Sequence, residues 1–503
     1  MTDATETNPR RWTALVFISL AKLMSILDAT IMTLALPSAQ RDLGISDGNR
    51  QWVITAYILA FGGLLLVGGR ISDVVGHKRV FVIGLLGFAG ASVVGSVANG
   101  TAMLLGARAL QGAFAALLTP ATLSLLTGIF AQGRERAKAF GIYAGIASSG
   151  EAIGLVVGGA LTGYLNWRWS FYITIPVAVI AAVGASIFVT DVPGSRSSRR
   201  LHVPGALLAT GGLVALVYGL TCAESDGWTA ARTLVMFAVG AILLAIFGLV
   251  ESRTASPLIP LRVVAERNRA GIYLSLGLAV IASLGLDFFL TYYFQTVKGW
   301  DPVATGLAFL PMSAGMIIGS SQIGARLMSR LPPRMLIGPG FLVAVAALLL
   351  LTQLDVDTPY ASVILPAQIL FGLGSGVAFM TAVSLATYRI DPRDIGAASA
   401  ILNTAQNVGG SVGIALLNTI AASATTSWLA NRDGIPNSAN EALVHGYVTG
   451  IWWSIGILVL ATAISVTFIT AGRQDGAHPT AGDEHNETAA DGSPTTDAGV
   501  AAH

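Results

Sequence analysis

Five charged residues stand inside long apolar stretches of this chain and are its main candidates for chemistry: Lys22, Asp28, Arg108, Glu151 and Asp287. A charge removed from water needs a partner or an aqueous cavity, because its burial in lipid is costly. A carboxylate in a low-dielectric cavity holds a proton more tightly than one in water, and can release it as the cavity opens to either side. A lipophilic cation could displace that proton directly. These residues therefore predict proton handling coupled to the binding of a small organic molecule.

The composition places these charges in a membrane. Of 503 residues, 53% are hydrophobic and 11% are charged, with a mean hydropathy of +0.69. Soluble domains carry about 25% charged residues, so a soluble protein could not hide this much apolar surface, whereas lipid accepts it. The net charge of +2 indicates no nucleic-acid partner, and the single cysteine, Cys222, excludes an intramolecular disulfide and a cysteine-based zinc cluster.

Apolar stretches of about 20 residues recur along the chain and predict an all-α integral membrane protein with fourteen transmembrane helices. We place them at residues 12–36, 51–69, 80–98, 102–124, 137–162, 169–190, 204–222, 232–250, 270–294, 303–325, 334–353, 360–386, 397–422 and 450–472. Of the 29 lysines and arginines, 21 fall on the side of the two termini, six in the opposite loops and two within spans. This bias predicts that both termini are cytoplasmic.

Helix geometry places Asp28 and Arg108 at one level of the bundle, where the two could meet. At 1.5 Å per residue, Asp28 lies roughly 12 Å and Arg108 roughly 9 Å from the outer ends of the first and fourth spans. An intramembrane pair of this kind is either part of the proton path or a structural ion pair that never titrates.

The other two carboxylates reach a similar depth. Measured from the cytoplasmic ends, Glu151 lies roughly 21 Å deep, Asp28 roughly 24 Å and Asp287 roughly 25 Å. We therefore expect the three carboxylates to approach one level of the bundle. Lys22 lies about 240° around the helix from Asp28, so it is no intrahelical partner; it either serves the substrate or neutralises a carboxylate.

Several segments resemble one family. Residues 27–37, Leu-Asp-Ala-Thr-Ile-Met-Thr-Leu-Ala-Leu-Pro, resemble the first-helix signature of the fourteen-helix drug:proton antiporters of the major facilitator superfamily. In span four, residues 105–112 are similar to the family's Arg-x-x-Gln-Gly motif. The resemblance runs from about Arg11 to Arg473 and implies two six-helix bundles with the substrate site between them, separated in sequence by two extra helices.

The loop after span two, residues 69–79, is similar to the superfamily loop Gly-x-Leu-Ala-Asp-Arg-x-Gly-Arg-Arg, with Val74 in place of the arginine after the aspartate. The resemblance implies a gating role for Gly69, Asp73, Gly76, Lys78 and Arg79. Without it, the same residues indicate a basic cytoplasmic turn.

Span five resembles the antiporter motif Gly-x-x-x-Gly-Pro-x-x-Gly-Gly through Gly150, Gly154, Gly158 and Gly159, with Leu155 at the proline. The four-residue spacing places the first three glycines on one helix face, where a neighbouring helix can approach closely. The resemblance implies an exporter rather than an importer.

Residues 167–176, Trp-Arg-Trp-Ser-Phe-Tyr-Ile-Thr-Ile-Pro, resemble a family segment at the outer end of span six. Aromatic side chains gather at membrane interfaces, so we predict that these anchor the helix and take no part in chemistry.

We expect seven parts along the chain: a cytoplasmic N-terminus (1–11), an N-terminal bundle (12–190), a cytoplasmic linker (191–203), two extra helices (204–251), a cytoplasmic loop (252–269), a C-terminal bundle (270–473) and an unstructured tail (474–503). The tail is rich in Asp, Glu, Thr, Ala and Gly and has no apolar periodicity.

The leading interpretation is proton-coupled efflux of an antibiotic or other amphiphile across the plasma membrane, by a monomer that uses the proton gradient and no cofactor or metal. Gly-Lys never occurs, so a nucleotide-binding P-loop is absent from the sequence, and an enzyme is not expected. The alternatives are a carrier that imports a metabolite and a membrane sensor that transports nothing.

Overall fold

The computed structural model describes residues 11–130, 134–190, 203–254, 266–328, 330–387, 395–430 and 438–470, and within them leaves out some side chains, including those of Arg70 and Asp73. The described residues form helices and connecting turns, with no β-strand among them. Most of the expected linker (191–203), part of the loop 252–269 and the tail (474–503) lie outside the described residues.

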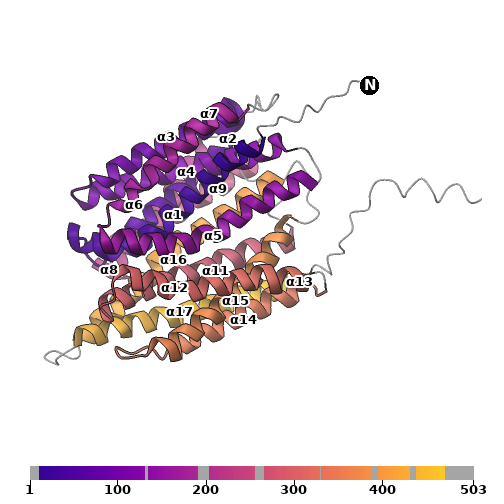
Figure 1. Cartoon of the computed structure of the whole chain (residues 1–503). Helices are drawn as coiled ribbons and strands as arrows, with labels where there is room; N and C mark the ends of the chain where they lie inside the picture. The colour runs from indigo at the N-terminus through magenta and orange to yellow at the C-terminus, as the bar shows by residue number, and fades with distance from the viewer. Residues whose placement is uncertain are drawn as a thin grey trace, which may run out of the picture.

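The helices form two groups that lie side by side (Figure 1). The N-terminal group comprises α1 (Arg11–Leu43), α2 (Trp52–Val75), α3 (His77–Ser96), α4 (Thr101–Ile129), α5 (Arg134–Tyr164), α6 (Trp169–Tyr172) and α7 (Thr174–Phe188). The C-terminal group comprises α11 (Arg267–Tyr292), η1 (Tyr293–Val297), α12 (Pro302–Ile318), η2 (Gly319–Gly324), α13 (Ala325–Met328), α14 (Arg334–Leu351), η3 (Tyr360–Ile364), α15 (Leu365–Thr387), α16 (Ile395–Ala430) and α17 (Ser438–Phe468).

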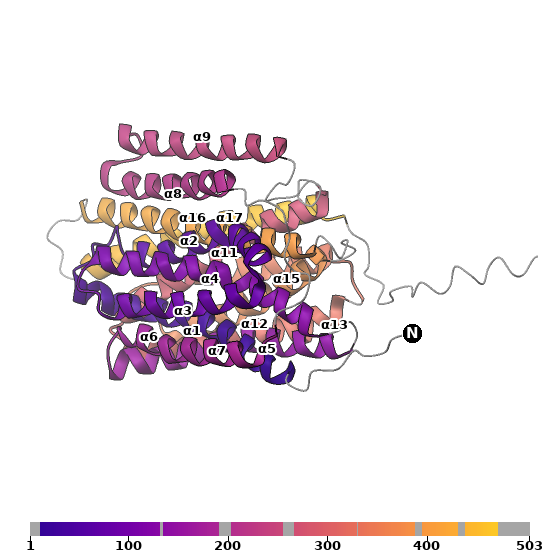
Figure 2. The same ribbon diagram turned by 90° about the horizontal axis from the view of Figure 1, so that it is seen from above.

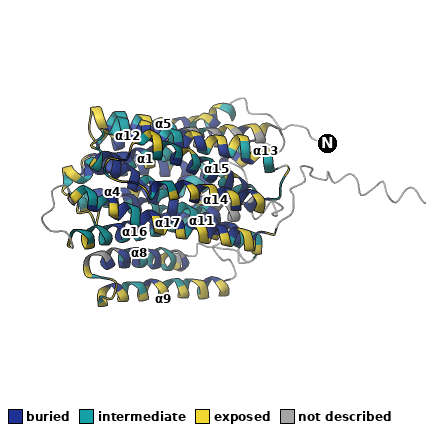
Figure 3. Cartoon of the chain, turned by 90° about the horizontal axis from the view of Figure 1, so that it is seen from below, coloured by how far each residue is buried: buried dark blue, intermediate teal, exposed yellow. Residues whose placement is uncertain are grey.

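Two further helices, α8 (Val203–Asp226) and α9 (Ala231–Arg253), stack on one flank of the molecule (Figure 2). α8 packs on α2 and α16, and α9 packs on α8. Exposed residues run along α9 (Figure 3), and only 11% of its most apolar stretch is buried. A helix this apolar and this exposed is suited to contact with lipid.

Each of the fourteen predicted spans overlaps one helix or two to three consecutive helices. By length and apolar composition, eleven helices in the described part of the chain can cross a bilayer. The helices α2, α5 and α8 fall short of that measure, yet they lie among the others, and the fourteen-helix layout fits the arrangement. The main difference is in the last span, which begins at Ser438 instead of residue 450 because its first turns carry polar residues that lower the local hydropathy.

α1 begins and α17 ends on the same side of the bundle, which we call the terminal side; the opposite side is the far side (Figure 1). Local signals explain several helix starts. Asp301, for example, caps α12 by accepting a hydrogen bond from the Ala304 amide at 2.7 Å, with Pro302 at the first helical position. Glycines allow the closest helix packing: a Cβ at Gly112 of α4 would lie 2.2 Å from the Tyr57 carbonyl oxygen of α2.

Candidate substrate and proton site

Asp28 of α1 and Arg108 of α4 form a buried ion pair, with Arg108 Nη1 2.6 Å from Asp28 Oδ2 and both side chains at most 2% exposed. Gln111 Nε2 donates to the other carboxylate oxygen at 2.9 Å, and Gln111 Oε1 accepts from Arg108 Nη1 at 2.8 Å. Arg108 Nε donates to the Val53 carbonyl oxygen at 3.0 Å. The two residues that helix geometry places at one level are therefore in direct contact, and both oxygens of Asp28 are occupied.

Further polar groups extend this network through the N-terminal group of helices. Gln111 Nε2 also donates to Ser92 Oγ of α3 at 2.9 Å, and Thr174 Oγ1 of α7 donates to the same oxygen at 3.0 Å. The ring centroid of Tyr57 lies 4.5 Å from the Arg108 guanidinium carbon, at a distance typical of a cation–π contact. We call Asp28, Arg108, Gln111, Ser92 and Thr174 the polar network.

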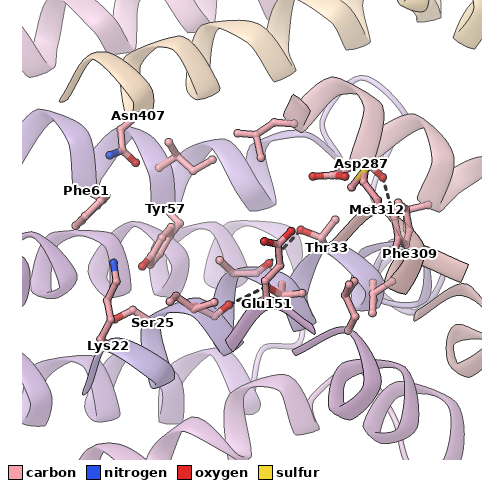
Figure 4. A pocket seen from close by; sticks show the side chains of 18 of the residues that line it. Lys22, Ser25, Thr33, Tyr57, Phe61, Glu151, Asp287, Phe309, Met312 and Asn407 are labelled. Atoms are coloured by element: carbon pink, nitrogen blue, oxygen red, sulfur yellow. Dashed lines mark hydrogen bonds between the residues drawn. The ribbon is translucent and has the colours of Figure 1, made fainter. Parts of the chain in front are cut away.

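A cavity of about 430 Å³ lies between the two groups of helices (Figure 4). Its described lining residues come from α1, α2, α4, α5, α11, α12 and α16 and are Lys22, Ser25, Ile26, Ala29, Thr30, Thr33, Leu34, Tyr57, Ile58, Phe61, Thr119, Glu151, Leu155, Leu284, Asp287, Thr291, Phe309, Met312 and Asn407. A largely apolar wall with a few convergent polar groups is typical of a small-molecule site.

The charged residues that line this cavity, among those described, are Lys22, Glu151 and Asp287. None of the three forms an ion pair with another described residue, and Asp287 Oδ1 is buried without a hydrogen-bond partner in the described part of the chain. Of the three carboxylates expected at one level, Glu151 and Asp287 line the same cavity, and their relative depth stays a prediction. Asp28 lies one layer behind its wall, where Tyr57 contacts both regions.

The span-five glycines bring Glu151 to the cavity. A Cβ at Gly150, Gly154 or Gly158 would approach α1, at 3.1 Å from Leu23, 2.8 Å from Thr30 and 2.9 Å from the Ile31 Cα respectively. The predicted single packing face is therefore present and holds α5 against α1. Gly159 faces another way, with its Cβ position 2.6 Å from the Pro302 carbonyl oxygen of α12. The glycines thus let α5 contact both groups of helices at once.

The loop predicted to act as a gate connects α2 and α3 on the terminal side. Gly76 has a φ of +107°, which favours glycine, and Ser72 Oγ lies 2.7 Å from His77 Nδ1. Lys78 Nζ donates to the Ser186 carbonyl oxygen of α7 at 2.9 Å, and Arg79 is exposed. Gly69 packs near Pro120 of α4. The side chain of Asp73 lies outside the described residues, and the gating role stays a prediction.

Sequence reasoning does not single out Arg50, one of the six basic residues assigned to the loops opposite the termini. Its side chain is 6% exposed, donates to Asp47 Oδ1 at 3.2 Å and Asn418 Oδ1 at 3.3 Å, and lies 4.0 Å from the Tyr292 ring centroid. The Tyr292 hydroxyl donates to Gln40 Oε1 at 2.6 Å. These contacts join α1 and the α1–α2 loop to α11 and α16 on the far side of the molecule. Its position just before a span was the available signal.

The prediction that the aromatic residues at the start of span six all anchor the helix at the membrane interface is wrong for one of them. Trp169 and Tyr172 are 39% and 40% exposed, as expected for anchors, but Trp167 is 2% exposed. Trp167 Nε1 donates to Asp42 Oδ2 at 2.9 Å, and Arg168 Nη1 donates to the same oxygen at 2.7 Å. Part of this segment therefore holds the far end of α1 instead of contacting the membrane interface.

Comparison with known proteins agrees with this architecture. The family model described as Major Facilitator Superfamily matches residues 18–414. The chain belongs to this superfamily. Among solved structures, this superfamily member is similar to a bacterial homologue of the human lysosomal transporter Spinster, with a TM-score of 0.66, 16% sequence identity, and coverage of 93% of this chain and 99% of that chain. At this identity the likeness shows the fold.

Curated relatives of this multi-pass membrane transporter are much closer in sequence. It is 48% identical over 464 residues to the puromycin resistance protein of Streptomyces alboniger, covering 92% of each chain. It is 36% identical over 416 residues to the cephamycin export protein of Amycolatopsis lactamdurans, covering 82% of this chain and 86% of the other. The tetracenomycin C resistance and export protein of Streptomyces glaucescens is 32% identical over 422 residues, with 84% and 78% covered.

Proposed function

We propose that this transporter exports an amphiphilic organic cation of antibiotic type in exchange for protons, and so confers resistance to that compound. It acts in the plasma membrane with both termini in the cytoplasm, as the charge bias of the loops indicates. Its partners are the small molecule, protons and the lipid bilayer.

One observation carries this proposal: Glu151 and Asp287 lie in a shared cavity between the two groups of helices without ion-pair partners among the described residues. Carboxylates at membrane depth are costly unless they serve a substrate or proton path. When a cavity opens to one side at a time, such carboxylates can carry protons in one direction and an organic cation in the other. The aromatic wall formed by Tyr57, Phe61 and Phe309 suits the apolar body of such a cation.

The relatives support the direction of transport, because they are named for resistance and export. Puromycin is the first compound to test, given 48% identity to a puromycin resistance protein. Import of a metabolite and a purely sensory role have no comparable support.

Inside-out membrane vesicles test the proposal directly. After respiration has acidified the lumen, puromycin added outside should enter as protons leave, so the lumen pH should rise. Asp287→Asn should reduce this exchange by more than about tenfold, which equals about 1.4 kcal/mol. Glu151→Gln should lower export of cationic compounds more than export of neutral ones.

Asp357→Asn is the matched control, because this carboxylate is exposed in the turn between α14 and η3 and lies outside the cavity. It should leave exchange unchanged. If the wild-type protein moves neither puromycin nor a panel of amphiphilic antibiotics against the proton gradient, the proposed function is wrong.

A further inference from the structure

Lys22 is a basic side chain in a cavity that otherwise carries two acidic ones. It lies on the stripe of α1 that lines the cavity, which continues through Ser25, Ile26 and Ala29 to Thr33. From Lys22 to Thr33 this stripe spans roughly 16 Å along the helix axis. The site and the function proposed above do not account for this lysine.

The charges are separated along the cavity (Figure 4). Lys22 stands at one end, beside Ser25 and Tyr57, while Asp287 stands at the other end beside Phe309 and Met312. Glu151 lies between them. Lys22 forms no ion pair within 4.0 Å with any described residue, so it does not serve as the fixed counter-ion of either carboxylate.

The count of charges then limits what the cavity can hold. With all three groups ionised, the described lining carries a net charge of −1. The polar network behind the wall adds nothing, because Asp28 and Arg108 neutralise each other. One bound monocation, or one proton, therefore makes the cavity neutral. A dication leaves an excess positive charge, and its second charge meets Lys22 when its first lies at the carboxylates.

We infer that Lys22 is a specificity-determining residue that restricts the cavity to singly charged organic cations and excludes doubly charged ones. This inference rests on the proposed function, because it concerns the substrate of the same site. At an effective dielectric constant of about 20, two like charges about 10 Å apart disfavour binding by roughly tenfold. Removal of the ammonium group should therefore admit dications without loss of monocations.

Ethidium and propidium provide a matched pair of probes, because they share one aromatic body and carry one and two positive charges respectively. Binding is measured by dye fluorescence on the purified full-length protein in lipid nanodiscs. The wild-type protein should bind ethidium at least about tenfold more tightly than propidium. Lys22→Met, which keeps the length of the side chain and removes its charge, should reduce that ratio roughly tenfold.

Two further variants serve as controls for the effect of charge and of position. Lys22→Arg retains a positive charge at any working pH and should behave as the wild type. Lys298→Met removes a lysine on the far side, where its Nζ lies 5.8 Å from the Tyr293 ring centroid, and should change nothing. The inference is overturned if the wild-type protein binds neither dye, if Lys22→Met leaves the ratio unchanged, or if Lys22→Arg behaves as Lys22→Met.

Failure of the proposed function gives a different result. In that case the dye preference and its dependence on Lys22 persist, but the vesicles show no exchange of protons for puromycin or other amphiphiles. Conversely, proton exchange with an unchanged dye ratio in Lys22→Met removes the inference and leaves the proposed function standing.

Discussion

The polar network and the cavity both contain acidic and basic residues, but the two regions differ in whether these residues form ion pairs. In the network, Arg108 and Gln111 occupy both oxygens of Asp28, and the ion pair is almost fully buried. In the cavity, Glu151 and Asp287 share space with Lys22 without forming an ion pair among the described residues. Tyr57 contacts both regions, because its ring faces Arg108 and it also lines the cavity.

The difference indicates how each region can contribute to transport. A buried pair whose hydrogen bonds are satisfied resists loss of either member, because the remaining charge would be left uncompensated. Groups that face a cavity without partners can exchange protons or ligands with little rearrangement. We therefore expect the cavity carboxylates to meet the substrate directly, and Asp28 to take part in proton coupling only when Arg108 moves away from it.

The strongest test of this comparison is Asp28→Asn. It leaves Arg108 buried without its anion, which should cost about 3–5 kcal/mol of stability, and proton-driven export should vanish. The double variant Asp28→Asn/Arg108→Gln removes both charges and should regain much of the stability. Thermal unfolding in detergent and puromycin-induced proton flux in vesicles provide the two measurements.

The two measurements separate coupling from structure. If Asp28 carries protons, the double variant recovers stability but no proton flux. Recovery of both would show that the pair is structural and that coupling belongs to Glu151 or Asp287. Exchange at the wild-type rate in Asp28→Asn alone would lead to the same conclusion.

Substitutions that disturb the packing of α5, the helix that carries Glu151, against α1 should have a smaller effect on stability and export. In Gly158→Ala the new Cβ would lie 2.9 Å from the Ile31 Cα, so the two helices must separate. Such overpacking should cost about 1–3 kcal/mol and lower export several-fold. Gly106→Ala is the control, because nothing lies within 4 Å of its Cβ position in α4. Equal effects of the two substitutions would contradict a role for close packing of α5.

The smallest effect on stability and export is expected for Tyr57→Phe, at the residue that contacts both regions. Tyr57→Phe keeps the ring that faces Arg108 and the cavity, so we expect a stability change below about 1 kcal/mol and export within about twofold of wild type. Tyr57→Leu removes the cation–π contact and should cost more. If Tyr57→Phe abolished proton flux while the protein remained folded, the hydroxyl would connect the network to the cavity, and the two regions would form one site.

Much of the fold could be predicted from the sequence because lipid imposes long apolar helices. The predicted spans located the helices, and their ends erred where polar turns extend a helix, as at Ser438. Helix geometry also predicted that Asp28 and Arg108 share one depth, since the depth of a residue in a straight span follows from its number. It could not predict that Gln111 would fill the second oxygen of Asp28, because that depends on rotation about the helix axis.

The two buried residues that the sequence did not predict, Arg50 and Trp167, were missed for the same physical reason. Arg50 and Trp167 lie near helix ends, where polar and aromatic residues are expected to face water or the interface, and the sequence does not reveal that both are buried. Their burial depends on packing between segments far apart in the chain: Arg50 contacts Asn418, and Trp167 contacts Asp42. Pairings of this range are set by tertiary structure, and the sequence around each residue does not identify its partner.

The position of α8 and α9 makes the two flanks of the transporter unequal. The seam between α2 and α16 is covered by α8, and α9 lies outside α8, whereas α5 and α12 meet on the opposite flank without an added layer (Figure 2). An amphiphile dissolved in the bilayer therefore meets a double wall on one flank and a single wall on the other. The seam between α5 and α12, which lies on the helix that carries Glu151, is therefore the thinner of the two barriers between the lipid and the cavity.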